Sequence, residues 1–547
     1  MLGSNAHSRP LIVLTACAMM CAVLCAMIPG PVQPPHPEKE GNVPAISPAN
    51  AYQEEGIEVR IRSEEGQALW VATDNRLKQS SSHGSDYTLK AHADMRNATR
   101  ALATPTAIQW RHPRPGLPAA MVVRAAQGRG PYAMRTYLFE RHALPVVSIS
   151  TDPDGVLGAA DGIAVPGEGI LRLPTSVQRT FANDPKWWKY PGNYHGRGKE
   201  WEREARIQLI GTDGEEILQA DAGIRINGQM TRGFPQHAYR LLFREALPVA
   251  PFADGDGVGS RALVLRAAGN DQVKAMLRDA YQHALCRGLP FGISKSRTCV
   301  VYINGAYQGV HHLRQRIDAR ELARRHGISR KRITLVEDKN ALVSGDSADL
   351  KRFAQLMSRT ERWDAADPAW IDSLEARMDM DGFLTYMASQ MILGNMDWPR
   401  QNVKYWRWNG KPEPGTVRDG RWRFVMGDSD LGFGANTPAT GDLFVKVRDA
   451  GTVLSRLHLA MMRSDSLRDR FVRIGQSLID GPLRSERCVA VLDSLAAIMR
   501  PEMRRHTDRW RKPADAEQWE SEIESMRAYA RARMLEARKQ LSAFQQP

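Results

Sequence analysis

The sequence predicts an α+β protein with an N-terminal β-sandwich module, then a sheet-rich lobe and a helical C-terminal part. Three observations predict this order. Short alternating runs separated by Gly, Ser, Asn and Pro fill residues 57–140. Further β-type runs continue to about residue 303, and residues 484–544 show charge-laced helical periodicity. A chain of 547 residues that is 42% hydrophobic and 25% charged can form several domains with complete cores.

The first 30 residues predict an export signal. Residues 11–28 are apolar and uncharged, and they lie between Arg9 and the pair Pro29 and Gly30. A bilayer is crossed by about 20 apolar residues, so a cleaved signal peptide and a retained membrane anchor both remain open for residues 1–30. Residues 31–55 are rich in proline and predict a linker. We therefore expect a periplasmic, extracellular or N-terminally anchored protein.

The globular part divides into two predicted regions. Residues 56–142 form the sandwich, with alternation in Ile57–Arg62 and Met121–Ala125, and residues 143–547 form one larger mixed domain. In the larger domain we expect strands near 205–211, 221–227, 238–244, 261–266 and 298–303, and a hairpin near 403–427.

The positive net charge does not predict a nucleic-acid partner. The chain has 75 Lys and Arg against 61 Asp and Glu, which gives +14. These charges are spread over the whole sequence, and no basic tail or array of basic and aromatic residues stands out. We therefore expect no nucleic acid among the partners of the protein.

The cysteines do not predict a disulfide scaffold. Three of the six cysteines fall within residues 11–28, which leaves Cys286, Cys299 and Cys488 in the exported part. Two alternatives stay open, a bridge between Cys286 and Cys299 or three buried free thiols.

Residues 381–430 contain the strongest chemical pattern. An apolar helix is predicted over 381–393, and Gly394 ends it. A loop containing Asp397 and Asn402 follows, then the hairpin, then Asp428-Ser429-Asp430. A phosphoryl-transfer site of the protein-kinase type has the same parts in the same order: a helix, a loop with Asp and Asn separated by four residues, a hairpin and a second Asp. In such a site carboxylate and amide oxygens hold Mg²⁺. The hairpin is expected to bring Asn402 and Asp428 together.

A second hairpin is predicted over Val300–Val310. Two strands flank an Asn304-Gly305 turn, and Gly309 lies on the second strand. An ordinary β-hairpin is the favoured interpretation, and a loop that covers phosphate groups is the alternative.

Several motifs in family order resemble the CotH kinase family, named for a spore-coat protein. The resemblance spans about 145–544 and rests on Trp201–Arg203, Gly223–Gly228, Thr231–Pro235, Tyr302–Gly305 with Gly309, Arg316–Asp318, Gly394–Asp397 with Asn402, and Asp428–Asp430. The N-terminal region, with Gly84–Tyr87, Val122–Ala125 and Arg135–Leu138, is similar to the immunoglobulin-like module of the chitobiase C-terminal type, which usually acts as a spacer.

This resemblance implies a two-lobed, atypical protein-kinase-like domain. The expected activity is transfer of the γ-phosphate of ATP to Ser or Thr of an exported protein, with ATP and Mg²⁺ as cofactors. Residue by residue, the resemblance implies Asp397 as the catalytic carboxylate and Asn402, Asp428 and Asp430 as metal ligands. It makes Arg225 and Arg232 candidates for phosphate contact, and the turn of Asn304 and Gly305 with Gly309 would be the phosphate-covering loop.

The chain also departs from the family pattern. Many members carry two lysines where this chain has Gln236 and His237, and Gln315 replaces the usual glutamate before Arg316. These changes remove charge that would neutralise phosphate or form a salt bridge, although Arg240 or Lys274 offers a substitute. They motivate an alternative, an inactive pseudokinase that serves in surface assembly or polymer binding. A glycan-active enzyme is a third class, suggested only by the chitobiase-like module and the 13 tryptophans.

Overall fold

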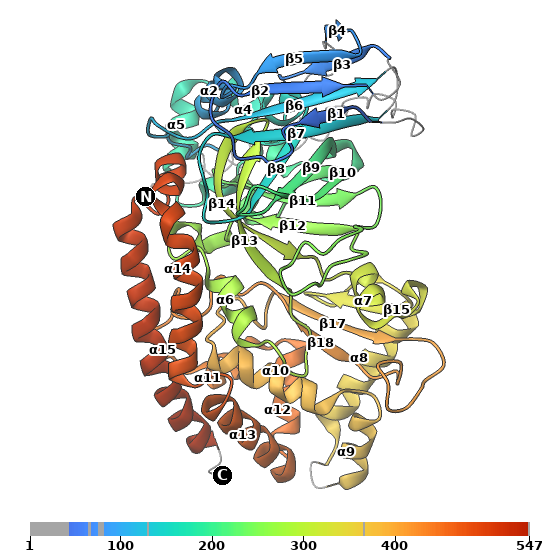
Figure 1. Cartoon of the computed structure of the whole chain (residues 1–547). Helices are drawn as coiled ribbons and strands as arrows, with labels where there is room; N and C mark the ends of the chain where they lie inside the picture. The colour runs from blue at the N-terminus through green and yellow to red at the C-terminus, as the bar shows by residue number, and fades with distance from the viewer. Residues whose placement is uncertain (1–42, 64–66, 75–80, 128–130, 365–366, 545–547) are drawn as a thin grey trace, which may run out of the picture. The chain divides into compact units, whose positions relative to one another are not determined.

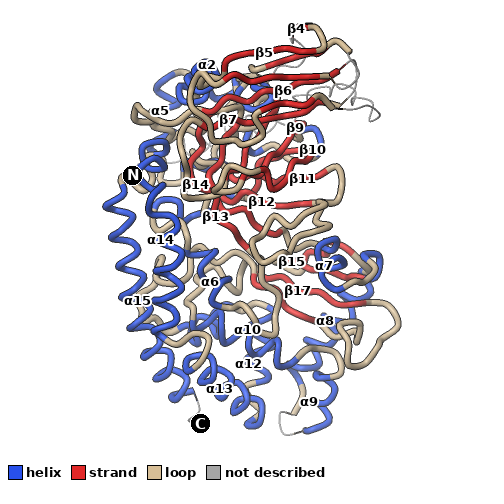
Figure 2. The backbone as a smooth tube through the Cα atoms, in the orientation of Figure 1, coloured by secondary structure: helices blue, strands red, loops and turns tan. Residues whose placement is uncertain are grey.

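The computed structural model describes residues 43–63, 67–74, 81–127, 131–364 and 367–544. It has 39% helix and 23% strand in several sheets, which confirms the α+β class. The predicted export segment lies outside these residues, and none of the helices described is long and apolar enough to cross a membrane. Figures 1 and 2 show the elements along the chain.

Contacts divide the chain into two compact units that are each built from separate segments. Unit 1 contains the described residues up to Gly269, together with Thr298–Leu313 and Pro501–Asp515. Unit 2 contains Asn270–Arg297, Arg314–Arg500 and the described residues from Ala516 onward. The predicted boundaries at 56–142 and 143–547 stay predictions, as do the kinase-like lobes.

The N-terminal part of unit 1 consists of two antiparallel sheets. One has the order β1-β2-β5 and the other β4-β3-β6-β7. A shared apolar cluster includes Val59 and Ile61 of the first sheet and Val123 and Tyr137 of the second. The immunoglobulin-like assignment of this region stays a prediction. The strands are β1 (Ala45–Ser47), β2 (Glu58–Arg62), β3 (Leu69–Ala72), β4 (Ser81–His83), β5 (Asp86–Lys90), β6 (Ala120–Gln127) and β7 (Tyr132–Leu138).

A closed barrel in the order β10-β11-β12-β14-β13-β8-β9 follows. Its strands are β8 (Val146–Thr151), β9 (Arg203–Ile210), β10 (Glu216–Asn227), β11 (Ala238–Phe243), β12 (Ala262–Arg266), β13 (Ser296–Ile303) and β14 (Ala306–Gln315). These positions confirm the strands predicted from the sequence. Its interior is a cluster of alternating side chains such as Ile149, Ile207 and Leu241. Short helices α2 (Met95–Ala103), α3 (Pro153–Leu157), α4 (Glu168–Leu171) and α5 (Thr175–Asn183) also belong to unit 1.

The Asn-Gly turn between β13 and β14 confirms the second predicted hairpin. Asn304 and Gly305 both have positive φ, 52° and 79°, as a type I′ turn requires. The Asn304 side-chain oxygen accepts a hydrogen bond of 2.9 Å from the backbone N–H of Thr151. This side chain therefore fixes the turn to the end of the neighbouring strand β8.

Unit 2 combines one antiparallel sheet, of order β16-β15-β17-β18, with many helices, shown in blue in Figure 2. The strands are β15 (Ile333–Glu337), β16 (Ala341–Ser344), β17 (Val403–Trp408) and β18 (Arg423–Met426). The helices are α6 (Arg278–Leu285), α7 (Ala319–His326), α8 (Ser347–Arg362), α9 (Pro368–Glu375), α10 (Met380–Ile392), α11 (Leu443–Ala450), α12 (Val453–Met461), α13 (Asp465–Asp480), α15 (Ala516–Phe544) and the part of α14 (Ser485–Trp510) that precedes Pro501. The described residues also contain 3₁₀ turns. Those of unit 1 are η2 (Trp187–Lys189), η3 (Asn193–His195), η4 (Lys199–Trp201) and η5 (Met230–Gly233); η6 (Gly269–Val273) begins at the last residue before unit 2, and η7 (Arg330–Arg332) lies in unit 2.

Helix α10 occupies the predicted position but is buried on almost all sides rather than along one face. All of its residues except Asp381 are buried, so it is a central helix of unit 2. Gly394 has a φ of 72°, which matches the predicted helix end.

The charge-laced sequence of α15 favours arginines on a solvated helix face, and this expectation is wrong for Arg533. Its side chain is fully buried. The guanidinium donates hydrogen bonds of 2.9 Å to the carbonyl oxygens of Met391 and Ile392, and bonds of 3.0 and 2.9 Å to those of Ala439 and Gly441. Carbonyls at a helix C-terminus lack partners within the helix, so Arg533 completes the end of α10.

The three cysteines of the described chain are free and buried. The bridge between Cys286 and Cys299 that the sequence allowed is therefore not formed. Burial raises the pKa of the Cys286 thiol to about 12 and that of Cys488 to about 11. Both side chains are thus neutral core residues at physiological pH.

A buried polar network fixes the C-terminal segment of unit 1. Glu502 lies 3.0 Å from the Nδ1 atom of His142 and accepts a 2.8 Å hydrogen bond from the hydroxyl of Tyr307. The other ring nitrogen of His142 lies 2.9 Å from the hydroxyl of Tyr302. Each member is buried, so each depends on the others for its hydrogen bonds.

Replacing Glu502 with alanine is expected to lower the free energy of unfolding by roughly 3 kcal/mol, because the Nδ1 atom of His142 and the hydroxyl of Tyr307 would stay buried without their common partner. Glu140 offers a matched control. The carboxylates of Glu502 and Glu140 both pair with Arg505, but that of Glu140 is 46% exposed. Glu140→Ala should change stability by less than about 0.5 kcal/mol. Denaturant unfolding of both variants tests this, and equal effects would contradict it.

Candidate active site

The loop after α10 carries Asp397 and is tied to the loop that carries Asp428. The side-chain amide of Asn395 donates a 3.0 Å hydrogen bond to Gln390 on α10 and a 3.2 Å bond to the backbone oxygen of Asp428. Gln390 and Asn395 are buried, whereas Asp397 and Asp428 are partly exposed. Asn395 thus joins the end of the helix to both predicted functional segments.

The β17–β18 hairpin brings Asn402 to Asp428, as the sequence predicted. Val403 pairs with Met426, so Asn402 and Gly427 face each other just outside the ladder. A Cβ atom on Gly427 would lie 2.4 Å from the carbonyl oxygen of Asn402, which leaves room only for glycine. Asn402 itself has a φ of 62°, a conformation that asparagine tolerates better than most residues.

Helix α6 holds the loop 427–430 through three side chains, and sequence reasoning missed them. Asp279 accepts a 3.0 Å hydrogen bond from the backbone N–H of Ser429, and Gln282 donates one of 2.6 Å to its carbonyl oxygen. The His283 Nε2 atom lies 2.9 Å from the carbonyl oxygen of Gly427. The available signal was the spacing of these polar residues at i, i+3 and i+4, which places them on one face of a buried helix.

Asp430 anchors this loop to residue 270. Its Oδ2 atom accepts a 2.7 Å hydrogen bond from the backbone N–H of Asn270, and its Oδ1 atom a 3.2 Å bond from the Asn270 side chain. Asp430 is 2% exposed. The structure therefore assigns it a supporting contact, and its role as a metal ligand stays a prediction.

Asp397 lies in an environment that disfavours its negative charge. Its pKa is raised by burial and by the charge of Asp428, and the charge of Lys446 opposes this. Lys446, on α11, donates a hydrogen bond to the carbonyl oxygen of Met396, and burial lowers its pKa to about 8. Asp397 thus has both a second carboxylate and a partly buried lysine near it, a grouping of perturbed charges that is typical of functional sites.

The oxygen donors present fit Mg²⁺. Asp428 supplies a carboxylate, the Asn402 amide makes no hydrogen bond with the described residues, and the Oδ1 atom of Asn395 is buried without a partner there. No group of three or more His, Cys, Asp or Glu in the described chain is placed to hold a metal. Mg²⁺ usually takes one or two carboxylates and completes its octahedron with phosphate oxygens and water, so this donor set suits a metal that arrives with a nucleotide.

The five residues predicted to contact nucleotide belong to unit 1, where most of them have structural contacts. Arg225 pairs with Glu202 at 2.8 Å. Arg232 donates hydrogen bonds to the carbonyl oxygens of Gly228 and Gly196 at 2.7 and 2.9 Å, and burial lowers its pKa to about 10. Asn304 and Gly305 form the turn described above. A Cβ atom on Gly309 would lie 2.6 Å from the Nδ1 atom of His506. Contact of these residues with nucleotide stays a prediction.

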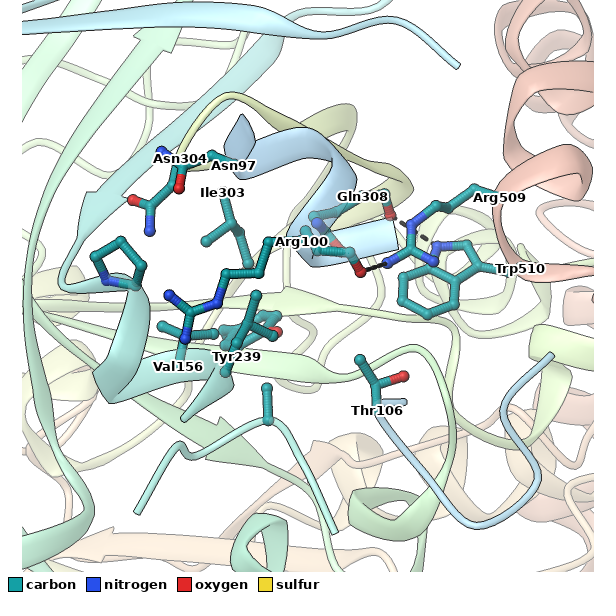
Figure 3. A pocket seen from close by; sticks show the side chains of 14 residues that line it. Asn97, Arg100, Thr106, Val156, Tyr239, Ile303, Asn304, Gln308, Arg509 and Trp510 are labelled. Atoms are coloured by element: carbon teal, nitrogen blue, oxygen red, sulfur yellow. Dashed lines mark hydrogen bonds between the residues drawn. The ribbon is translucent and has the colours of Figure 1, made fainter. Parts of the chain in front are cut away.

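Asn304 also lines a small cavity of unit 1, shown in Figure 3. Gln308, Tyr239, Arg509 and Trp510 line it as well, and its volume is about 20 Å³. This volume holds a water molecule or two, whereas small-molecule sites usually measure about 300–1,000 Å³. The cavity is therefore too small for a nucleotide.

Two of the three departures from the family pattern are buried in unit 1. Gln236 donates a 2.8 Å hydrogen bond to the carbonyl oxygen of Val310. His237 lies 3.0 Å from the carbonyl oxygen of Thr106, and burial lowers its pKa to about 4. Both side chains are therefore neutral at pH 7 and supply no charge for phosphate.

The third departure, Gln315, lies in unit 2 beside a carboxylate. Its side-chain nitrogen donates a 3.3 Å hydrogen bond to Glu321, which also pairs with Arg324 at 2.6 Å. Lys274, the substitute cation suggested by the sequence, is also in unit 2 and donates to the carbonyl oxygen of Ala435, just past the 427–430 loop.

Comparison with known families gives one match. The family model described as CotH kinase protein matches residues 224–536, which include every catalytic and metal-binding residue predicted above. No curated protein matches the chain.

Asp397→Asn is expected to stabilise the metal-free protein by roughly 1 kcal/mol at pH 7, the usual size of the gain when strain at a functional site is removed. The reason is the raised pKa: the ionised carboxylate is disfavoured above that pKa, and protonation removes the cost below it. The gain should therefore shrink as the pH falls toward 4.

Thermal unfolding at pH 7 and at pH 4 measures this difference. Asp449→Asn removes a carboxylate that is 66% exposed on α11 and should leave stability unchanged. A lower melting temperature for Asp397→Asn than for the wild type at pH 7 would contradict the electrostatic argument.

Proposed function

The chain belongs to the CotH kinase family, and we propose that it is an exported protein kinase that transfers the γ-phosphate of ATP to Ser or Thr hydroxyls of an envelope or secreted protein. The observation that carries this proposal is the convergence of Asp397, Asn402 and Asp428 on two loops of unit 2, with a raised Asp397 pKa. Such a grouping is what phosphoryl transfer needs, because positioning and charge neutralisation provide most of the catalysis.

In this proposal Asp397 binds and orients the acceptor hydroxyl and takes its proton. A raised pKa makes the Asp397 carboxylate a better proton acceptor than that of an ordinary aspartate. Asn402 and Asp428 hold Mg²⁺, and Asp430 keeps their loop in place through Asn270. When bound, Mg²⁺ with ATP supplies the phosphoryl group and the positive charge that its oxygens require.

Positive side chains of unit 2 support this arrangement. Lys446 holds the carbonyl of Met396 next to Asp397 and partly offsets the carboxylate charge. Lys274 lies near Ala435 and is the cation we assign to phosphate contact in place of the lysines absent at 236 and 237. Arg225, Arg232 and the turn of Asn304, Gly305 and Gly309 keep their proposed role toward the nucleotide.

In this proposal the N-terminal regions export the protein and hold the kinase-like domain away from the membrane. Residues 1–30 direct export or anchor the chain, and residues 56–142 are an immunoglobulin-like spacer. The linker predicted over 31–55 is limited to the residues before β1, because Ala45–Ser47 belong to a sheet of unit 1. Residues 143–547 form the two-lobed kinase-like domain. The partner is an exported acceptor protein, without nucleic acid.

A second function, an inactive kinase that binds a partner during surface assembly, rests on a specific observation. Gln236 and His237 are buried and neutral, so two charges that many family members carry are missing. In that case the fold binds without turnover.

Asp428→Ala is expected to reduce phosphate incorporation from ATP and Mg²⁺ by roughly 10³-fold or more, the effect of removing a group that stabilises transferring charge. Asp449→Asn, on the exposed surface of unit 2, should keep full activity. Labelled ATP with the purified protein and a generic Ser-containing acceptor measures both. Equal incorporation by the Asp428 variant and the wild type would refute the site.

Nucleotide binding separates the two functions. A ligand at 100 times its dissociation constant adds about 2.7 kcal/mol to stability, which a thermal shift detects. A shift with ATP and Mg²⁺ but no incorporation would favour the inactive kinase, and incorporation lost in the Asp428 variant favours the enzyme.

Activity is expected to fall as the pH rises through about 8, the pKa of Lys446. Lys446 is charged below this pH, and loss of the charge releases its hold on Met396 and removes the positive charge beside Asp397. Lys446→Arg stays charged and should move the decline to higher pH. Rate profiles between pH 6 and 10 test this, and superimposable profiles would show that Lys446 does not act in this way.

A further inference from the structure

Unit 2 contains a concave site at the other end of the β17–β18 hairpin from Asn402 and Asp428. This groove has a volume of about 480 Å³. We call it the arginine groove, because Arg352 and Arg359 of α8, Arg377 after α9, and Arg407 of β17 line it. Trp422, next to β18, lines it too. Its volume is typical of ligand sites of about 300–1,000 Å³.

The arginine groove carries more positive than negative charge. Four arginines and two carboxylates, Asp349 and Asp419, line it, so the lining has a net charge of four minus two, or +2. Asp419 is already paired with Arg421 at 2.6 Å and Arg423 at 2.8 Å, which lie outside the lining. The carboxylate of Asp349 is buried and accepts a 2.5 Å hydrogen bond from Thr334. Asp349 also pairs with Arg352 at 2.8 Å and with Arg407 at 3.3 Å, so Arg359 and Arg377 are the lining arginines that have no acidic partner among the described residues.

Two of these guanidinium groups are available to a ligand. Arg359 is exposed and makes no hydrogen bond or ion pair with the described residues. Arg377 is exposed and donates only to the backbone and hydroxyl oxygens of Ser373, both at 2.8 Å. Arg352 is 59% exposed and pairs with Asp349 at 2.8 Å. A planar guanidinium donates two parallel hydrogen bonds to a carboxylate or phosphate, so this lining suits anionic groups.

The hairpin fixes the distance between the arginine groove and the candidate active site. Arg407 and Asn409 of the groove follow Asn402 along β17 and its end. Five to seven residues at about 3.3 Å each put them roughly 20 Å from Asn402. An extended peptide covers this distance with about six residues.

We propose that the arginine groove docks an anionic segment of the acceptor protein, with carboxylates or phosphates that lie about six residues or more from the hydroxyl that receives phosphate. This inference rests on the proposed kinase function and adds the substrate class to it. A peptide is the favoured occupant because the site is a bounded groove with aromatic walls at Trp363 and Trp422. Glutamate and phosphoserine share the chemistry that arginine recognises, and the test distinguishes them.

The experiment uses the full chain and fluorescent peptides that contain one Ser acceptor and a tail of four residues. The tails are Glu, phosphoserine or Gln, joined by Gly-Ser linkers of two or eight residues. Anisotropy without ATP measures docking, and phosphate incorporation measures transfer. The anionic tails should bind at least tenfold more tightly than the Gln tail, and only the eight-residue linker should lower KM. The tighter of the two anionic tails identifies the natural group.

A triple variant, Arg352→Gln with Arg359→Gln and Arg377→Gln, tests the residues. It should weaken anionic-tail binding at least tenfold and leave incorporation into the Gln-tailed peptide unchanged. The control removes three exposed arginines of unit 2 outside the groove, Arg320→Gln with Arg362→Gln and Arg448→Gln. Equal weakening by both triple variants would overturn the proposal, because it would reflect net charge alone.

Two further outcomes are decisive. Tail-dependent binding that the groove variant abolishes, without any incorporation, would support the arginine groove and refute the kinase function. Equal binding of the Gln and anionic tails, or tighter binding of single-stranded RNA to the same arginines, would overturn the docking proposal and leave the kinase function to its own test.

Discussion

Asp397 and Asp428 are held close together although their charges repel, and much of unit 2 is arranged to keep them there. The repulsion between the two carboxylates contributes to the raised pKa of Asp397. Hydrogen bonds from groups that do not titrate hold the two loops in place against this repulsion. Asn395 ties one loop to the other, and α6 holds the backbone of Ser429 from both its N–H and its carbonyl. Hydrogen bonds to backbone groups fix a loop without neutralising its carboxylates, so the site keeps its affinity for a cation.

The two loops begin on elements that cannot move easily. Arg533 crosses from α15 to the last carbonyls of α10, so a buried charge fixes the point at which the Asp397 loop starts. Gly427 packs against the backbone of Asn402, so the hairpin brings Asn402 and Asp428 into register without an intervening side chain. Preorganisation of this kind lowers the reorganisation needed when substrate binds.

Local sequence patterns predicted those features of the structure that depend on interactions between residues close together in the chain. The hairpin between Asn402 and Asp428, the Asn304-Gly305 turn and the end of α10 at Gly394 all follow from residues within one element and its turn. The contacts of Asp279 and Asn270 with residues 429 and 430 join positions about 150 apart in sequence, and no periodicity encodes them. The same holds for Arg533, whose helix has the composition of a solvated surface although this side chain lies in the core.

The departures from the family pattern show how a change of charge depends on its surroundings. Gln236 and His237 are buried among carbonyl acceptors, where a neutral donor satisfies a backbone oxygen without the desolvation cost of a lysine. Gln315 donates a hydrogen bond to Glu321, so the uncharged side chain at 315 lies beside a carboxylate supplied by another residue. The effect of each departure thus depends on the groups around it.

The β17–β18 hairpin connects the candidate active site of unit 2 with the arginine groove. Its base presents Asn402 and Asp428, and its far end presents Arg407 to a groove with excess positive charge. A paired β-strand is stiff over six residues, so the two regions keep a fixed separation whatever segment occupies them. For an enzyme that acts on an extended protein, binding in the arginine groove would then favour particular acceptor hydroxyls at the candidate active site. Only a segment with the right spacing between its anionic group and its hydroxyl occupies both sites. In the proposed function, the short hairpin that brings Asn402 and Asp428 together therefore also sets the spacing that an acceptor must match.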